Sequence, residues 1–387
     1  MTDAKMAEAQ VTDEMLESMR ARAGLELRIE HSVFNEEATR LAIAKFAAGI
    51  GDHNPLWKDP AYAATSPWNG VVAPPSFVIG VFSGLQFGWP GLGSFHAGTT
   101  VELHGPVRLG DVVTPVCVYD GFDGPRPSSF ATFMIVDHFT NTYRNQDGTS
   151  LATIKWSVVN FERERAKQTG RDGDLQLPHP WTEDEVREIE EQVLGEEPRG
   201  AEARWWEDVE VDDRLDCLTK GPIGITDEIA FVAGGGAPIP RLAANGVALR
   251  SYRRHPPWAF RDPQTKALEP IYAVHYNRHA ARAMGVALEY DVGFQRQCWQ
   301  LQLLSNWMGD SGWVKRADTR YRRFVYLGDV VRLEGTVTRK YVDGDGEPCV
   351  DVTTTAVNQR GEEVMPGSAT IALPSRELGT SPVDRRR

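Results

Sequence analysis

Two halves of the sequence repeat one another at a constant offset. The pair Gly110-Asp111 recurs as Gly328-Asp329, which lies 218 residues later. The same offset relates three further pairs in the same order: Ala63 and Ala281, Trp89 and Trp307, and Gly91 and Gly309. Chance can produce one such match but not an ordered set over some fifty residues, so we infer an internal duplication. The length of 387 residues also fits two units.

Each half predicts the same order of secondary structure. A short helical stretch (36–48 and 227–233) precedes a Gly-rich segment and a loop. A longer apolar helix follows (76–87 and 294–308), and then three or four strands. One helix followed by a run of antiparallel strands predicts an α+β fold in which the sheet wraps around the helix.

A charged segment separates the two halves. Residues 166–200 form the predicted linker, in which Thr182 and Glu185 have the spacing of a helix capping box. We therefore expect an N-terminal domain at 1–165 and a C-terminal domain at 201–387.

Composition and charge argue against several classes of protein. Acidic residues outnumber basic ones by 54 to 42, and the net charge of −12 argues against a nucleic-acid partner. No apolar run of about 18 residues predicts a membrane span. The first 24 residues have no apolar core of a secretory signal, so we expect a cytoplasmic protein. The four cysteines form no C-x-x-C pair and no residue set has zinc spacing, so we expect neither a metal nor a cofactor.

The most informative motif lies at residues 46–59. It reads FAAGIGDHNPLWKD and is followed by Ala63 and Ala73-Pro74-Pro75. This stretch resembles the signature of the MaoC-like, (R)-specific enoyl-CoA hydratases and dehydratases, which have the hotdog fold. The second half resembles the same family more weakly, through Val274-His275-Tyr276-Asn277 and residues 321–329. The resemblance covers most of the chain outside the ends and the linker. It implies a double hotdog with a dehydratase-like N-terminal half.

The resemblance also implies a reaction, namely the syn addition of water to a trans-2-enoyl-CoA or the reverse dehydration. In the family, an Asp and a His hold one water, and a backbone N–H at the start of the central helix binds the thioester oxygen. Water needs a positioned base, and the enolate charge needs a fixed donor. An acyl-CoA thioester is therefore the expected partner. A homodimer of double hotdogs is compatible with the duplication, as is a monomer.

The first-half copy of the site departs from the family pattern. Asp52 matches the family Asp, but Trp57 stands at the His position. The amide position falls on Pro75, which has no N–H. We therefore expect the first half to be catalytically silent.

The second-half copy keeps the other parts of the pattern. His275 lies 218 residues after Trp57, and Gly293 fills the amide position 18 residues further on. The family Asp aligns with Ala237, so the carboxylate is missing. His275 is thus either an acid–base group or a packed or solvent-facing histidine. Its partner carboxylate is open among three candidates: Asp310, Asp291, or Asp52 reaching across from the first half.

About 33 extra residues precede His275, and we place this insertion at 239–270. Arginine forks and aromatic faces in it suit the phosphates and adenine of CoA. We expect four residues to contact the substrate: Arg250, Arg253, Arg254 and Tyr290. The alternative is a surface lid whose arginines balance an acidic chain. His96, near a first-half strand edge, either lines a pocket or is structural.

Three functions are compatible with this sequence. The first is hydration of trans-2-enoyl-CoA to 3-hydroxyacyl-CoA, or the reverse. The second is a non-catalytic acyl-CoA-binding protein or the silent subunit of a heteromeric hydratase, which explains the broken site without further residues. The third is a hotdog acyl-CoA thioesterase. A shared fold does not distinguish them, because function depends on the site.

Overall fold

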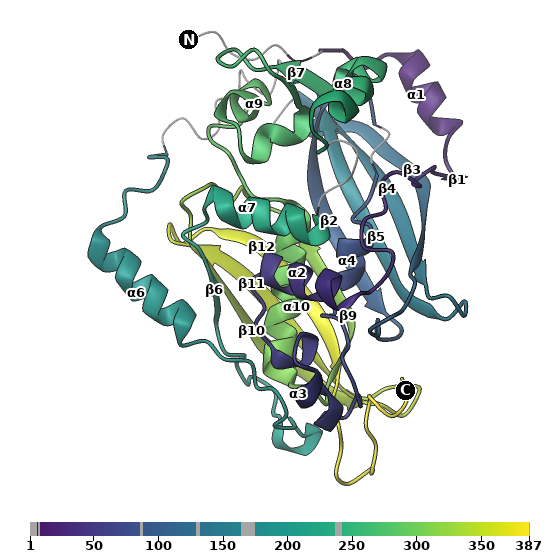
Figure 1. Cartoon of the computed structure of the whole chain (residues 1–387), viewed down its shortest axis with the longest axis vertical. Coiled ribbons are helices and arrows are strands. Elements are labelled where there is room, and N and C mark those ends of the chain that lie inside the picture. The colour runs from purple at the N-terminus through teal and green to yellow at the C-terminus, as the bar shows by residue number, and fades with distance from the viewer. Residues whose placement is uncertain are drawn as a thin grey trace.

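The computed structural model describes residues 6, 8–85, 88–128, 132–163, 175–236 and 242–386. One antiparallel sheet of ten strands contains both halves, in the order β1-β3-β4-β5-β2-β9-β12-β11-β10-β6 (Figure 1). The first half contributes β1 Leu25–Glu26, β2 Gly93–Leu103, β3 Thr114–Ser128, β4 Thr132–Arg144 and β5 Ser150–Phe161. The second contributes β6 Leu218–Lys220, β9 Trp313–Arg320, β10 Val331–Val342, β11 Pro348–Asn358 and β12 Glu363–Ala372.

Side chains alternate across the sheet, as a half-buried strand requires. In β5, Ile154, Trp156 and Val158 are buried, whereas Lys155 between them is exposed. Successive side chains of a strand point to opposite faces, so one face of β5 packs on the core and the other faces outward.

Strands β2 and β9 join the two halves edge to edge. In their antiparallel register Thr100 pairs with Asp318, and the Thr100 hydroxyl donates to Asp318 Oδ1 at 2.5 Å. These two residues are 218 positions apart, so they are equivalent in the repeat. Equivalent residues meet in an antiparallel pair only near a local twofold axis. The duplication predicted from the sequence is therefore confirmed.

The helices lie along and around this sheet (Figure 1). Their bounds are α1 Asp13–Arg20, α2 Arg40–Gly49, α3 Pro60–Thr65, α4 Phe77–Val81, α6 Glu183–Leu194, α7 Ile225–Phe231, α8 Asn245–Arg254, α9 Arg278–Ala283 and α10 Gly293–Met308. Helix α10 is the core of the second half: every residue except Gly293 and Asn306 is buried. The predicted capping box of α6 is present, with Thr182 and Glu185 satisfying one another's backbone N–H groups.

The long helix predicted at residues 76–87 is wrong at residues 82–85, and residues 86 and 87 lie outside the described residues. The chain becomes extended at Phe82, whose carbonyl accepts a hydrogen bond from the Tyr143 hydroxyl instead of continuing the helix. Gly84 then adopts a φ of +135° against Trp156, a conformation that suits glycine. An apolar run alone could not reveal this early end, which leaves room beside the N-terminus of α10.

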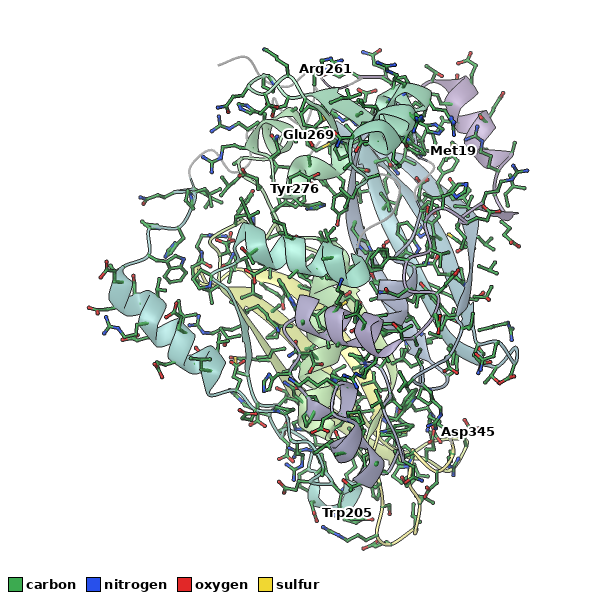
Figure 2. The ribbon with its side chains drawn as sticks, in the orientation of Figure 1. Met19, Trp205, Arg261, Glu269, Tyr276 and Asp345 are labelled. Carbon is green, nitrogen blue, oxygen red and sulfur yellow. The ribbon has the colours of Figure 1, made fainter. Side chains whose placement is uncertain are left out.

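Two further regions frame the molecule. The described part of the insertion forms α8 and a small hairpin of β7 Ala259–Arg261 and β8 Leu268–Pro270. Arg261, Glu269 and Tyr276 mark this end of the molecule in Figure 2.

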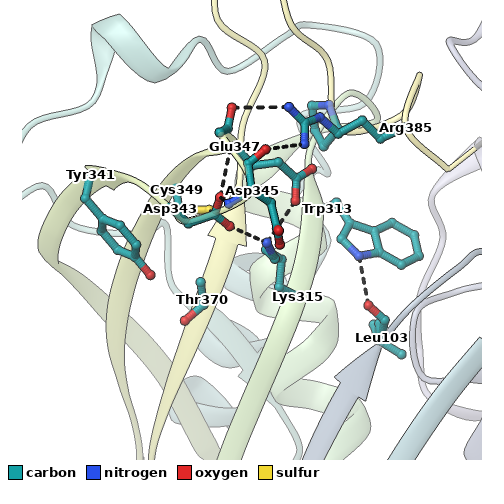
Figure 3. Close-up of polar contacts among 12 residues, drawn as sticks. Leu103, Trp313, Lys315, Tyr341, Asp343, Asp345, Glu347, Cys349, Thr370 and Arg385 are labelled. Atoms are coloured by element: carbon teal, nitrogen blue, oxygen red, sulfur yellow. Dashed lines mark hydrogen bonds and ion pairs between the residues drawn. The ribbon is translucent and has the colours of Figure 1, made fainter.

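At the opposite end, Lys315 Nζ lies between the carboxylates of Asp343 and Glu347, at 2.5 and 2.8 Å (Figure 3). Nearby, Trp313 donates to the Leu103 carbonyl at 3.1 Å and so connects the halves.

Candidate functional site between the two halves

A cavity of about 470 Å³ lies where the shortened first-half helix leaves space. Its walls come from both halves: Gly84 and His96 from the first, and His275, Tyr290 and Gly293 from the second. The structure thus brings His275 and Gly293 into one cavity, as the resemblance predicts.

His275 closes the short 3₁₀ helix Ile271–His275. Its Nδ1 lies 2.7 Å from the Tyr290 carbonyl oxygen, which can only accept, so Nδ1 carries the proton. Removal from water lowers the pKa of His275 to about 4, despite the opposing effect of that hydrogen bond. The ring is therefore neutral at pH 7, with an unprotonated Nε2. A neutral imidazole of this kind can accept a proton from water.

Gly293 begins helix α10, and its N–H has no intrahelical acceptor. The preceding residue, Val292, provides no side-chain cap, and no described residue accepts a hydrogen bond from this N–H. The positive end of the α10 dipole adds to the donor. This end of α10 can therefore stabilise an oxygen on which negative charge develops.

His96 of β2 packs directly on Gly293. A methyl group at position 293 would stand 2.8 Å from His96 Nδ1, so a residue without a side chain is required. On its other side, His96 Nε2 lies 2.9 Å from the Thr99 hydroxyl. Burial lowers the pKa of His96 to about 3, and Arg296 adds to the effect, so this ring is neutral too. The sequence placed His96 near a strand edge but did not relate it to Gly293.

Asp52 and Asp310 do not line this cavity, which corrects the expectation that one of them partners His275. Asn54 connects them: its N–H donates to Asp52 Oδ1 at 3.0 Å, and its amide donates to Asp310 Oδ1 at 3.3 Å. The Tyr62 hydroxyl also donates to Asp310, at 2.6 Å. Asn54 and Tyr62 of the first half thus satisfy the carboxylate of Asp310, which belongs to the second half.

The first-half copy of the site is nearly filled. Its remaining cavity measures about 40 Å³ and is lined by Trp57, Pro74 and Pro75 as well as Asn54 and Asp310. Trp57, at the His position, is almost completely buried. A large ring and two residues without N–H groups leave neither a histidine base nor an amide donor at the family positions.

The carboxylate nearest in sequence to Gly293 is Asp291, which lines the larger cavity. Burial raises the pKa of Asp291 to about 6, although its ion pair with Arg296 at 2.6 Å opposes the shift. Asp291 is therefore mostly ionised at pH 7, and Arg296 neutralises its charge. The position aligned with the family Asp, Ala237, lies outside the described residues.

Glu228 of α7 was not predicted and lies near Asp291. It is 1% exposed, and neither carboxyl oxygen has a hydrogen-bond partner among the described residues. Burial and the neighbouring Asp291 raise the pKa of Glu228 well above its ordinary value of 4.5, so the fold favours its protonated form. The sequence did contain a signal, because Glu228 occupies the position of the buried Ile43 when Phe231 is aligned with Phe46.

The four predicted substrate contacts separate into two groups. Arg254 and Tyr290 line the cavity. Arg250 and Arg253 are exposed on α8 and are not among its lining residues. Arg253 directly precedes Arg254 and so lies on a different face of α8, whereas Arg250 lies on the same face one helical turn away.

A basic groove of about 930 Å³ adjoins the cavity and shares His96, Arg296 and Phe324 with it. Its exposed cations are Arg126, Lys155, Arg320, Arg322 and Arg323, and its acidic lining residues are Asp120 and Glu362. Within the described ranges no acidic group pairs with Arg126, Lys155 or Arg322. Clustered cations without partners favour an anionic ligand.

Neither a metal cluster nor a membrane-spanning helix is found among the described residues. Across the described ranges, no group of three His, Cys, Asp or Glu side chains is placed to hold a metal ion. None of the described helices combines the length and apolar character that crossing a bilayer requires.

Sequence comparisons match parts of the chain. The family described as "FAS1-like, dehydratase domain region" matches residues 29–154. A UPF0336 protein of Thermobifida fusca is 36% identical over 86 residues, which are 20% of this chain and 57% of that protein. An (R)-specific enoyl-CoA hydratase of Aeromonas caviae is 40% identical over 75 residues, 19% of this chain and 54% of that protein. The chain spans about half the length of these curated relatives.

Solved structures match nearly the whole chain. A MaoC-like dehydratase superposes with a TM-score of 0.62 and 18% identity, over 92% of this chain and 99% of that one. A MaoC domain dehydratase of Chloroflexus aurantiacus gives 0.57 and 14%, over 92% and 96%. A double-hotdog protein of Mycobacterium tuberculosis gives 0.53 and 14%, over 91% and 96%. The fold is therefore a double hotdog. Its signature loop and local sequence matches are similar to those of MaoC-like hydratases and dehydratases.

Proposed function

We propose that this protein adds water to trans-2-enoyl thioesters to give 3-hydroxyacyl thioesters, or catalyses the reverse dehydration. One observation carries the proposal: a neutral His275 and the open N–H of Gly293 line the same cavity. Similarity to an (R)-specific enoyl-CoA hydratase supports the same reaction.

The geometry suggests how the reaction proceeds. His275 Nε2 takes a proton from water, and the resulting hydroxide adds to C3 of the substrate. Electrons move to the thioester oxygen, which accepts a hydrogen bond from the Gly293 N–H. The enolate then collapses, and C2 takes the proton back from the imidazolium. Hydroxide and proton come from one water and one base, so addition on a single face is expected.

The basic groove supports coenzyme A as the carrier of the acyl group. CoA has a diphosphate and a 3′-phosphate, and cations without acidic partners bind such groups strongly. Arg126, Lys155 and Arg322 are exposed in a groove that adjoins the reaction cavity. This assignment places the phosphates on the sheet rather than on Arg250 and Arg253 of the insertion.

The test is hydration of a series of trans-2-enoyl-CoAs, from crotonyl-CoA to bulkier acyl groups, followed by the loss of enoyl absorbance. We expect turnover with at least one of them, and a rate at least about 10²-fold lower by His275→Ala. Background rates with the whole series, or full turnover by His275→Ala, would refute the proposal.

Charge reversal tests the CoA assignment separately. In the double variant Lys155→Glu/Arg322→Glu, kcat/KM for the CoA thioester should fall at least about tenfold, because each charge-assisted contact contributes about 1.5–3 kcal/mol. The ratio of this value to kcat/KM for the matching phosphate-free pantetheine thioester is the measurement. Lys58→Glu, a single charge reversal on an exposed residue outside the groove, is the control. An unchanged ratio in the double variant contradicts the assignment.

The lowered pKa of His275 predicts an unusually acid-tolerant enzyme. Because only the neutral ring is a base, kcat/KM should stay constant from pH 8 to about 5 and fall only as the pH approaches the pKa of about 4. A histidine with the ordinary value of 6.5 would already lose about tenfold at pH 5.5. Initial rates across this range decide between the two, with circular dichroism at each pH as the control for folding.

A non-catalytic acyl-CoA-binding role is the second candidate. The observation that favours it is the separation of Asp52 and Asp310 from His275, since the family pairs an Asp with its His. In that case calorimetry would show binding of acyl-CoA while hydration stayed at background.

A further inference from the structure

His96 brings a second nitrogen to the helix terminus at which the thioester oxygen is expected. The residue lies in β2 of the first half, whereas Gly293 begins α10 of the second. His96 Nδ1 lies beside Gly293, 2.8 Å from where a Cβ would stand. The ring packs on Phe294 at 4.3 Å between centroids, which holds it beside the first turn of α10.

The proton on His96 depends on its second nitrogen. Nε2 lies 2.9 Å from the Thr99 hydroxyl, and that hydroxyl lies 3.3 Å from the Tyr321 hydroxyl. When Tyr321 donates to Thr99 and Thr99 donates to Nε2, the ring is protonated at Nδ1, which faces Gly293. Thr99 is 1% exposed, so water does not compete for these bonds.

We propose that His96 is a second oxyanion donor: its Nδ1–H and the Gly293 N–H together bind the thioester oxygen. This inference rests on the proposed hydration. In the enolate, the electron pair of the C2–C3 double bond has moved to that oxygen, and two fixed donors stabilise its charge without reorganisation. His96 donates a hydrogen bond and transfers no proton, so the stoichiometry of the reaction is unchanged.

The arrangement also explains features that a single donor leaves unexplained. A neutral imidazole keeps its N–H as a fixed hydrogen-bond donor. An imidazolium would instead lose its extra proton to water or substrate. The charge of Arg296 favours the neutral ring. Glycine at 293 is required because any side chain would displace His96. The first half, silent in its own signature loop, thereby contributes one group to the second-half site.

The test compares His96→Phe, His96→Gln and Thr99→Val in the enoyl-CoA assay. Loss of one oxyanion donor lowers kcat by about 10²–10³-fold, so we expect a fall of this order in His96→Phe. Binding of the saturated acyl-CoA should change less than about twofold, because a ground-state carbonyl gains little from the donor. His96→Gln, which keeps an N–H, should recover part of kcat. Thr99→Val should lower kcat, and Thr99→Ser should restore it.

Each outcome of these assays leads to one conclusion. If wild type hydrates and His275→Ala does not, but His96→Phe keeps full kcat, the donor role is wrong and the proposed function stands. If binding of the saturated acyl-CoA weakens in parallel with kcat, His96 only shapes the cavity, which also overturns the role. Should His96→Phe fail to fold, Thr99→Val decides, and an unchanged kcat in it contradicts the proposal. Absence of hydration by wild type refutes the proposed function itself.

Discussion

Replacing His275 with alanine should lower kcat by about 10²–10⁴-fold, the range for loss of a positioned general base. The reason is geometric, because His275 Nε2 is the free nitrogen of a neutral ring whose other nitrogen is fixed by the Tyr290 carbonyl. Binding of acyl-CoA should be nearly unchanged, since the ring contributes one polar edge to a cavity with many other walls. Steady-state hydration and calorimetry of the same preparations measure the two effects.

Two control variants make this result specific. His53→Ala removes another imidazole, one that is exposed and paired with Glu197 at 3.1 Å, and should keep full activity. Asp310→Asn should also keep kcat while losing stability, because Tyr62 and Asn54 donate to that carboxylate. Equal loss of turnover in Asp310→Asn and His275→Ala would instead place the carboxylate in the reaction.

Replacing Glu228 with leucine should raise the free energy of unfolding at pH 8 by about 1–3 kcal/mol, the usual cost of a buried polar group without partners. The folded-state pKa of Glu228 is raised, so folding favours its protonated form. The stability linked to this proton is complete below the unfolded value of about 4.5. It is lost as the pH rises through the folded pKa. The variant should therefore gain less at pH 5 than at pH 8, in urea unfolding at both pH values.

The comparison with wild type at each pH isolates this one group. The lowered pKa values of His96 and His275 act in the opposite direction, because they make the folded protein less stable in acid. Wild type and the variant share both histidines, so this effect cancels in the comparison. Glu190→Gln, on an exposed position of α6, should change nothing at either pH. A variant less stable than wild type at pH 8 would show that Glu228 has a stabilising partner in solution.

Sequence patterns predicted the scaffold well because they reflect local or repeated features. The 218-residue offset anticipated the pairing of Thr100 with Asp318. The apolar run at 294–308 predicted α10 to within one residue. The matching run at 76–87 gave a helix that is too long, since its end depends on Tyr143 and Trp156, which lie 61 and 72 residues beyond Phe82 and Gly84.

The sequence by itself determined the duplicated hotdog scaffold, and it predicted a silent first-half signature and singled out His275 and Gly293 as candidate groups. Tertiary structure alone decided which groups surround them. It placed Asp310 with Tyr62, His96 on Gly293, and Glu228 near Asp291. Side chains 248 residues apart in the sequence, those of Tyr62 and Asp310, meet only after the two halves pack. Periodicity and spacing describe neighbours along one element, so they contain no information about such meetings.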